Sequence, residues 1–382
     1  MQYRTLGKTG LKVSLLGLGC MRLPFINNEA HLGVDMEAAL ELIRYAADNG
    51  VNYFDTAFGY HNKESESILG QALEHKRKDV IYVTKQPFWE MRDQATIRTN
   101  LENTLKKLRT DYIDVYLLHC IQPRAWGDIQ QKEIFKEFEN FKREGLIKHI
   151  GFSYHGDYET FTDIVEKYPW EVCKVQHNLL DINREVTPKG IEFAGKRDLG
   201  IAIMEPLRGG GLSTVSSAVK SIYDNAHIKR TPTEWAFRYL VNMPEVSVIT
   251  SGMSNMQQLK ENIAMFSQAD MLANSLTDAD NAVISSVRKA YESAVSIPCT
   301  QCNYCVPCPA GVQIPNIFGL YNDGHRFEHF DQPRRSYMFA RRGNGDASAC
   351  TSCQLCLKKC PQEINIIEEL KTAHAALDGW NE

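Results

Sequence analysis

The sequence predicts an α/β fold: a TIM-type (β/α)8 barrel followed by a smaller, mostly α-helical C-terminal domain. Three observations predict it. Eight short β-rich runs alternate with amphipathic, charged stretches over residues 1–265. Most of the β-rich runs are apolar throughout, as in parallel strands buried on both faces. Eight of the eleven cysteines gather in two short runs near the C-terminus, which sets that region apart from the alternating part.

The predicted strands each span six to nine residues, and helical patterns separate them. The strands are 13–21, 51–56, 80–85, 113–119, 148–153, 173–178, 200–206 and 245–250. The clearest helical patterns are 36–50, 92–110 and 129–145, the last of which ends in glycine, as helices often do. Eight βα units in about 250 residues suit a TIM barrel. A doubly wound open sheet is the alternative, and the lack of G-x-G-x-x-G after the first strand weighs against it.

The two cysteine runs predict iron–sulfur clusters. The second run reads C-x2-C-x2-C-x3-C-P, the ferredoxin pattern for a four-iron cluster, and the first has one residue fewer before its last cysteine. In two-cluster ferredoxins the fourth cysteine of each run binds the other cluster. On that pattern one [4Fe–4S] cluster takes Cys299, Cys302, Cys305 and Cys360, and the other takes Cys350, Cys353, Cys356 and Cys308.

Zinc and disulfides are the alternatives for these cysteines. Zinc would leave the second C-x2-C-x2-C triplet and both Cys-Pro pairs unexplained. A disulfide framework is disfavoured because MQYRTLGKTG is not a secretory signal and the rest of the chain is typical of a cytosolic enzyme. We therefore expect a ferredoxin-like dicluster domain at 298–382, a barrel at 1–270 and a linking helix within 271–297. A reducing cytoplasm suits the clusters.

Composition excludes two classes of partner. The net charge of −4 gives no indication of nucleic-acid binding. No apolar stretch approaches the ~20 residues that cross a bilayer, so no membrane partner is expected. Four arginines between the cysteine runs, Arg334, Arg335, Arg341 and Arg342, suit an acidic electron carrier, or else form a solvated face or salt bridges to the barrel.

Polar residues recur where the predicted strands end. They are Asp55, Lys85, His119, Ser153, Gln176 and Glu205. In a TIM barrel the active site lies at the C-terminal ends of the strands. Six polar residues in register there indicate a site rather than six separate structural hydrogen bonds.

The stretch NYFDTAFGYHNKESESILG (52–70) resembles the aldo/keto reductase family, as do VIYVTK and DVYLLH. The resemblance covers about residues 1–265 and implies a TIM barrel that binds NADP or NAD without a Rossmann fold. It assigns a catalytic tetrad to Asp55, Tyr60, Lys85 and His119. The whole chain is similar to members of that family that carry a C-terminal ferredoxin-like domain.

The tetrad suits carbonyl reduction. Hydride addition leaves negative charge on oxygen, and Tyr60 would donate the proton. We expect Lys85 to lower the pKa of Tyr60, Asp55 to hold Lys85, and His119 to orient the carbonyl. Taken singly, Tyr60 also suits a surface aromatic, and His119 a core histidine.

The resemblance also assigns cofactor contacts. Ser153 and Gln176 match the positions that bind the carboxamide, while Tyr154 stands where the family has asparagine. Met204 replaces the ring that stacks on the nicotinamide. The other candidates are Leu207, Arg208 and Gly209 for the pyrophosphate, Ser251, Gly252, Gln258 and Asn262 around the last helix N-terminus, and Gly19 and Met21. Gly252 and Gln258 stand where NADP-preferring members place Lys and Arg, so the sequence does not favour NADP over NAD.

The two halves predict an oxidoreductase acting on a small carbonyl or alcohol, with clusters that exchange electrons with a ferredoxin- or flavodoxin-like carrier. Hydride moves two electrons and a cluster moves one, so a converter is needed. A flavin would serve, although no flavin motif is seen. Two alternatives stay open: a reductase with structural or redox-sensing clusters, and a non-catalytic, nucleotide-sensing electron-transfer subunit.

Overall fold

The computed structural model describes residues 1–91, 93–131 and 134–379, which form two compact units. The barrel unit comprises Met1–Leu207 and Ala236–Leu276. The cysteine unit comprises Arg208–Trp235 and Thr277–Glu382. Each unit has its own buried hydrophobic core.

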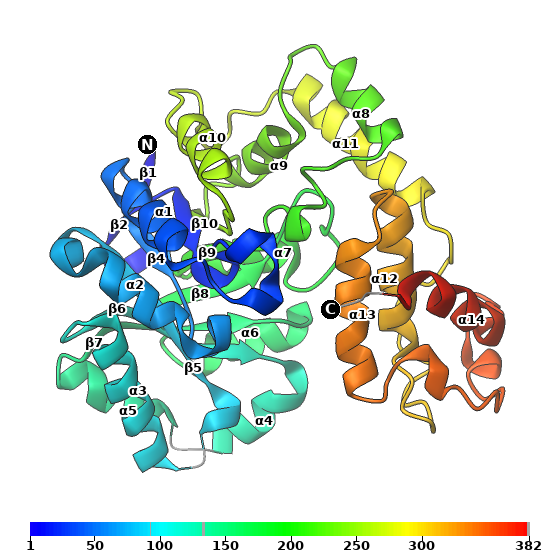
Figure 1. Ribbon diagram of the computed structural model, residues 1–382, viewed down its shortest axis with the longest axis horizontal. Helices are drawn as coiled ribbons and strands as arrows, with labels where there is room; N and C mark the ends of the chain where they lie inside the picture. Colours follow the sequence, from blue (N-terminus) through cyan, green and yellow to red (C-terminus); the bar gives the residue numbers. More distant parts are fainter. Residues whose placement is uncertain (92, 132–133, 380–382) are drawn as a thin grey trace. The chain divides into compact units, whose positions relative to one another are not determined.

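The barrel unit confirms the predicted fold. The barrel strands are all parallel and close into a ring with helices around it (Figure 1). They are β3 (Leu16–Gly19), β4 (Tyr53–Asp55), β5 (Ile81–Pro87), β6 (Ile113–Ile121), β7 (Ile147–Tyr154), β8 (Val172–Gln176), β9 (Gly200–Met204) and β10 (Val246–Ser251). Each overlaps one predicted strand. The barrel closes where Ile249 of β10 pairs with Leu16 of β3.

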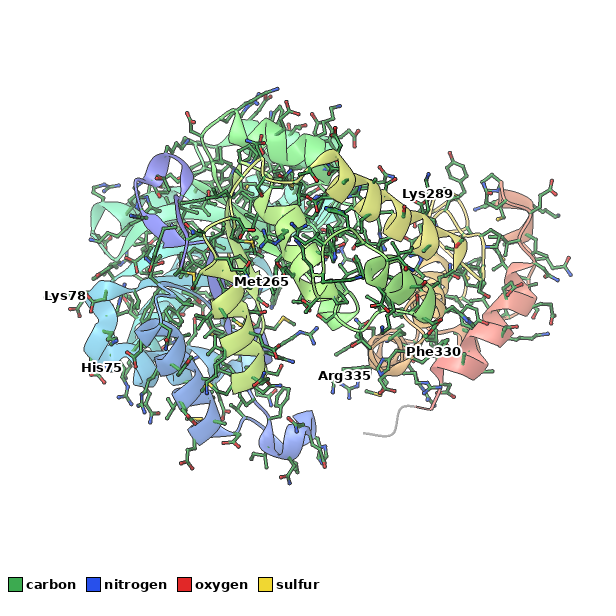
Figure 2. The ribbon with its side chains drawn as sticks, turned by 90° about the horizontal axis from the view of Figure 1, so that it is seen from above. His75, Lys78, Met265, Lys289, Phe330 and Arg335 are labelled. Carbon is green, nitrogen blue, oxygen red and sulfur yellow. The ribbon has the colours of Figure 1, made fainter. Side chains whose placement is uncertain are left out.

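Helices follow the barrel strands and bury their apolar sides on them. They are α1 (Met36–Asp48), α2 (Ser65–Leu73), α3 (Gln94–Leu108), α4 (Pro123–Gln131), α5 (Ile134–Arg143), α6 (Tyr158–Lys167), α7 (Thr187–Gly195), α9 (Pro232–Val241) and α10 (Met256–Phe266). The predicted helix 129–145 is wrong at its start, which lies in α4. Residues 132–133 lie outside the described residues. The turn after α2 is at the outside of this unit, where His75 and Lys78 are exposed (Figure 2).

The predicted first strand, 13–21, is wrong in its extent. It splits at Leu15 into β2 (Lys12–Ser14) and β3, and Cys20–Arg22 form a 3-10 turn that includes Met21. β2 pairs antiparallel with β1 (Tyr3–Thr5), a strand that the sequence pattern did not reveal. Leu6 and Val13 of this hairpin pack on inward-facing residues near the start of the barrel strands, so the apolar run stays buried across the split.

The cysteine unit is mostly helical, as predicted. Its helices are α8 (Ser217–Asp224), α11 (Asp278–Ser293), α12 (Ile314–Arg326), α13 (Asp331–Arg342) and α14 (Ile366–Leu377). Thr277 caps α11 in a capping box with Asp280. The small core includes Phe318, Tyr337 and Leu370, and partly buried cysteines pack against it. None of the described helices is long and apolar enough to cross a bilayer.

Two glycines give a matched test of the barrel packing. A Cβ on Gly70 of α2 would lie 2.4 Å from the Lys107 carbonyl oxygen of α3. Gly127 of α4 is exposed, and a Cβ there would meet nothing within 4 Å. We expect Gly70→Ala to destabilise the fold by about 1–3 kcal/mol through overpacking. Gly127→Ala should stabilise it by up to about 1 kcal/mol through helix propensity. Denaturant unfolding of both variants measures the difference, and equal midpoints would contradict the close α2–α3 approach.

Candidate functional site

The structure brings the four tetrad side chains together at one end of the barrel. Asp55 ends β4, Lys85 lies in β5, His119 lies in β6, and Tyr60 begins a 3-10 turn after β4. The Lys85 Nζ atom lies 2.7 Å from Asp55 Oδ1 and also donates to the Thr56 carbonyl. The same Nζ lies 4.8 Å from the centroid of the Tyr60 ring, and the rings of Tyr60 and His119 are 6.1 Å apart, edge to face. A phenol, a cation and an imidazole therefore share one space, in which Lys85 is buried and Tyr60 and His119 are half-buried.

Burial controls the protonation of this site. It raises the pKa of the Tyr60 phenol, the Asp55 carboxylate raises it further, and Lys174 opposes the rise. The expectation that Tyr60 has a lowered pKa is therefore wrong for the protein side chains alone. Burial, and then the Lys85 charge, lower the pKa of His119 to about 3. At neutral pH the phenol holds its proton and His119 is uncharged, so each offers a neutral hydrogen-bond donor.

His119 is oriented by aromatic contacts on two sides. Its ring lies 5.4 Å from that of Trp89, in addition to the Tyr60 contact. Its Nδ1 atom is buried and has no hydrogen-bond partner in the described part of the chain. A buried nitrogen without a partner is costly, which marks this position as one built for a further polar group.

One buried charge in this site was not predicted from the sequence. Lys174 of β8 reaches across the barrel interior, and its Nζ atom lies 2.7 Å from the same Asp55 Oδ1 that Lys85 contacts. The signal was present, because Lys174 lies two residues before Gln176 and therefore on the same face of the strand.

The predicted carboxamide contacts lie at the ends of neighbouring strands. Ser153 is buried in β7, and its Oγ atom accepts a hydrogen bond from the Cys120 amide at 2.7 Å, which leaves its own proton to donate. Gln176 ends β8 and pairs in register with Met204 at the end of β9. Tyr154, at the family's asparagine position, instead donates to the Asp157 carbonyl.

The candidate contacts on the first and last barrel strands also lie close together. A Cβ on Gly19 would lie 3.4 Å from the Ser251 carbonyl oxygen, and a Cβ on Gly252 would lie 3.1 Å from the Arg22 side chain. A side chain at Gly252 would therefore crowd the bend that follows β10. Met21 is exposed beside them.

The N-terminus of α10 is capped by its own residues. The Asn255 side chain accepts from the Gln258 amide, and Gln258 Oε1 accepts from the Ser254 amide, both at 2.9 Å. Asn262 is buried one turn further on. Gln258 thus already has a structural partner.

The candidate pyrophosphate loop spans the boundary between the units. Leu207 is the last residue of the barrel unit in that segment, whereas Arg208 and Gly209 belong to the cysteine unit. The Arg208 Nη2 atom donates to both carboxylate oxygens of Asp323 in α12, at 3.0 and 2.9 Å. Gly209 has a positive φ of 66°, which glycine adopts without strain.

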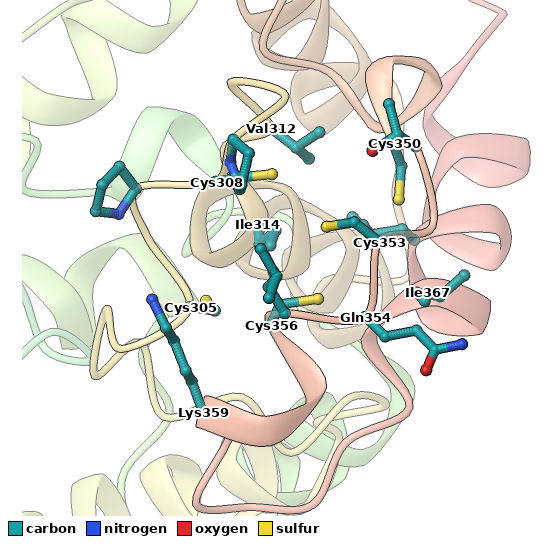
Figure 3. Close-up of a pocket in the computed structure, with 15 residues that line it drawn as sticks. Cys305, Cys308, Val312, Ile314, Cys350, Cys353, Gln354, Cys356, Lys359 and Ile367 are labelled. Atoms are coloured by element: carbon teal, nitrogen blue, oxygen red, sulfur yellow. The ribbon is translucent and has the colours of Figure 1, made fainter.

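The eight clustered cysteines line two cavities in the cysteine unit. The first includes Cys308 with Cys350, Cys353 and Cys356, whose sulfur atoms point into a common space (Figure 3). The second includes Cys299, Cys302 and Cys305 with Cys360. Each cavity therefore holds one triplet and the last cysteine of the other run, as the ferredoxin pattern predicts.

Cys305 also borders the first cavity, so its assignment needs a second observation. It also lines the second cavity, together with Cys299 and Cys302, which precede it at three-residue spacing. We therefore group Cys305 with its own triplet.

The donor set of these cavities fits iron–sulfur clusters. Their linings are mostly apolar apart from the sulfurs, and Lys359 borders both. In the described chain no three His, Cys, Asp or Glu side chains are grouped as a single metal ion would need. All eight thiols are free of disulfides.

Two family models match the chain. Residues 15–283 match the aldo/keto reductase family model, and residues 298–365 match a 4Fe-4S dicluster domain. Among curated proteins, the uncharacterized oxidoreductase YqkF of Bacillus subtilis is 27% identical over 69% of this chain and 90% of its own length. L-galactose dehydrogenase of Arabidopsis thaliana is 27% identical over 71% of this chain and 90% of its own.

Solved structures agree on the barrel. The holo form of aldo-keto reductase AKR11C1 from Bacillus halodurans has a TM-score of 0.62 at 25% identity, covering 75% of this chain and 96% of its own. An aldo/keto reductase from Klebsiella pneumoniae, in complex with NADP and acetate, has a TM-score of 0.60 at 21% identity, covering 75% and 95%. The latter likeness concerns the fold alone.

The crossed cysteine arrangement predicts which variants share a phenotype. We expect about eight irons per chain in protein purified without oxygen. Cys308→Ala should remove the same cluster signal as Cys353→Ala, although Cys308 belongs to the other run. Cys360→Ala should match Cys302→Ala. Electron paramagnetic resonance of the four variants measures this. Stoichiometric zinc, or loss of signals by run instead of by cavity, would contradict the assignment.

Cys173→Ala is the control for these variants. This thiol is fully buried in β8 of the barrel unit and lines neither cavity. Its loss should leave both cluster signals and the iron content unchanged.

Proposed function

Because the chain belongs to the aldo/keto reductase family and carries a 4Fe-4S dicluster domain, we propose that it transfers hydride between a nicotinamide and a small carbonyl or alcohol. The clusters would then exchange single electrons with a partner. The observation that carries the first part is the buried contact of Lys85 with Asp55 at 2.7 Å beneath the Tyr60 ring. The proposed domains are a barrel at 1–270, a linking helix within 271–297 and a dicluster domain at 298–382. Eight thiols that would bind oxygen-sensitive clusters suit a reducing cytoplasm.

In the reduction direction, Tyr60 donates its proton to the carbonyl oxygen. A nicotinamide bound there would supply the hydride that forms the C–H bond, while the Tyr60 proton forms the O–H bond. The phenolate left behind is stabilised by the Lys85 ammonium near its ring. Neutral His119 donates a hydrogen bond that orients the same oxygen.

Ser153 and Gln176 would hold the carboxamide, with Met204 against the ring. The residues at the ends of β3 and β10, Gly19, Met21, Ser251 and Gly252, would line the cofactor path, with Gln258 and Asn262 of α10. In the candidate pyrophosphate loop, Leu207, Arg208 and Gly209 would contribute backbone amides. NAD and NADP are both compatible with this set.

We propose that a ferredoxin- or flavodoxin-like carrier reaches the clusters at the cysteine loops. Cys302 and Cys353, the second cysteine of each run, are exposed. Beside them Tyr304 and Leu355 are 64% and 49% exposed, which suits the apolar centre of a contact surface. Lys358 follows in the second loop and suits an acidic partner.

Two arginines of the predicted basic cluster already have partners within the cysteine unit. Arg341 lies 2.6 Å from Asp378, and Arg334 donates to the Ala376 carbonyl. Contacts within the cysteine unit therefore hold these two arginine side chains. For this reason we place the docking surface at the cysteine loops rather than at the arginines.

The tetrad assignment predicts the effect of one hydroxyl. Tyr60→Phe should lower the rate of carbonyl reduction about 100-fold or more, because the proton donor is lost. Binding of the nicotinamide should change little. Tyr53→Phe is the matched control, since the Tyr53 hydroxyl is also buried in the barrel and has no hydrogen-bond partner among the described residues. Steady-state kinetics over a panel of carbonyls with NADH and NADPH measures both. If Tyr60→Phe keeps more than a few per cent of the rate, Tyr60 is not the acid.

The coupling between the two sites predicts a dependence on a flavin. Anaerobic NADH or NADPH alone should leave the clusters oxidised, although dithionite reduces them. Adding FMN should allow nicotinamide to reduce them, because a flavin accepts a hydride and releases electrons singly. The visible spectrum and electron paramagnetic resonance follow the reduction, and Cys353→Ala should lose one of the two signals.

Fast reduction without any flavin would contradict the need for a converter. No reduction with FMN, beside fast carbonyl turnover, would favour structural or sensing clusters.

A further inference from the structure

Lys174 is a buried charge that the proposed tetrad does not include. Its side chain is 5% exposed, and those of Asp55 and Lys85 are 1% exposed. Both ammonium groups lie 2.7 Å from the same oxygen, Asp55 Oδ1, while Asp55 Oδ2 has no partner among the described residues. Two cations therefore converge on one side of one carboxylate.

The surroundings do not neutralise the second cation. Asp55 is the only carboxylate that ion-pairs with Lys174 in the described part of the chain. The other titratable groups that interact with this cluster are uncharged at neutral pH. They are the phenols of Tyr60 and Tyr53, the Cys20 thiol and the His119 imidazole. With both lysines protonated, the interior holds one positive charge more than Asp55 balances.

The fold alone gives no reason for this charge. A buried ion costs free energy even when it is paired, and an apolar or neutral side chain of similar size is often as stable or more so. Asp55 already has Lys85 as its partner. Removing Lys174 would leave a balanced pair rather than an orphaned carboxylate.

We propose that Lys174 supplies the positive charge that stabilises Tyr60 as it gives up its proton, so that two lysines, not one, support the acid. This inference rests on the proposed reductase function. Lys174 acts through Tyr60 and does not itself touch the substrate. The charge interactions of Lys174 agree with this role. Lys174 is the cation that most opposes the raised pKa of Tyr60. It also lowers the pKa of Asp55 more than Lys85 does, whereas burial raises that pKa.

The proposal implies that Lys174 supports activity at the expense of stability. Burial lowers the pKa of Lys174 below its usual value, Asp55 opposes this, and Lys85 adds to it. The unfolded chain therefore binds more protons than the folded chain between that lowered pKa and the ordinary lysine pKa near 10.4. Stability should rise with pH across this window in the native chain, and a variant without Lys174 should lack that rise.

The experiment compares Lys174→Met, which removes the charge and keeps an apolar chain, with Lys174→Gln, which keeps a hydrogen bond to Asp55. Lys196→Met, at an exposed lysine on the outside of the barrel, is the control for the substitution itself. We expect both Lys174 variants to lower kcat for carbonyl reduction about tenfold. The alkaline limb of their pH–rate profiles should move up by about one pH unit, because Tyr60 becomes a weaker acid. Nicotinamide affinity should not change.

The same variants should unfold at an equal or higher temperature than the native chain at pH 7, with the gap closing toward pH 10. A lower unfolding temperature for both would show that Lys174 serves the fold, and the proposal would be wrong. Unchanged kcat and pH profiles in both, beside an inactive Tyr60→Phe, would also overturn it while leaving the proposed function intact. A native chain that reduces no carbonyl would overturn the proposed function and this inference together.

Discussion

The burial of the Asp55 carboxylate determines the arrangement inside the barrel. An ionised carboxylate taken out of water is stable only with a cation close by, and Lys85 and Lys174 both reach it from other strands. These contacts tie β4, β5 and β8 together inside the barrel. They also bring an ammonium beneath the Tyr60 ring, so the pairing that stabilises the carboxylate places positive charge beside the phenol that we propose as the proton donor.

Sequence patterns predicted the barrel because its strands are apolar over their whole length. Only strands that are buried on both faces give continuous apolar runs, and each of these runs overlaps a barrel strand. The hairpin was missed for the opposite reason. β1 has three residues, of which two are exposed, so neither its length nor its polarity distinguishes it from a loop. The run 13–21 read as one strand because Leu15, at the split, is as buried as its neighbours.

Sequence patterns also predicted only part of the charged residues in the candidate site. Asp55, Lys85 and His119 were found because each ends an apolar run, which is where a TIM barrel places function. Lys174 lies inside such a run, and a single lysine in a strand is compatible with either face. Lys174 lies two residues before Gln176, so the alternation of a strand would have placed it on the inward face. Its partner on β4, however, is brought near by the closure of the barrel, which no local sequence pattern specifies. Burial also raises the pKa of Tyr60, against the prediction from the sequence. The sequence shows the nearby cations but does not show how far the phenol is removed from water.

The two sites differ in their environment, and the difference follows from the electrons they would move. Hydride transfer with proton donation benefits from a dry interior, where fixed charges act strongly on the reacting oxygen. Single-electron exchange with a partner protein requires that the partner approach closely, and the second cysteine of each run is exposed. A chain that carried both chemistries in one cavity would have to be closed for the first and open for the second. Separate units, each with its own core, allow each site its own degree of exposure. Any electron exchange between the two sites would still need a carrier that handles electrons both in pairs and singly, because hydride moves two electrons and a cluster moves one.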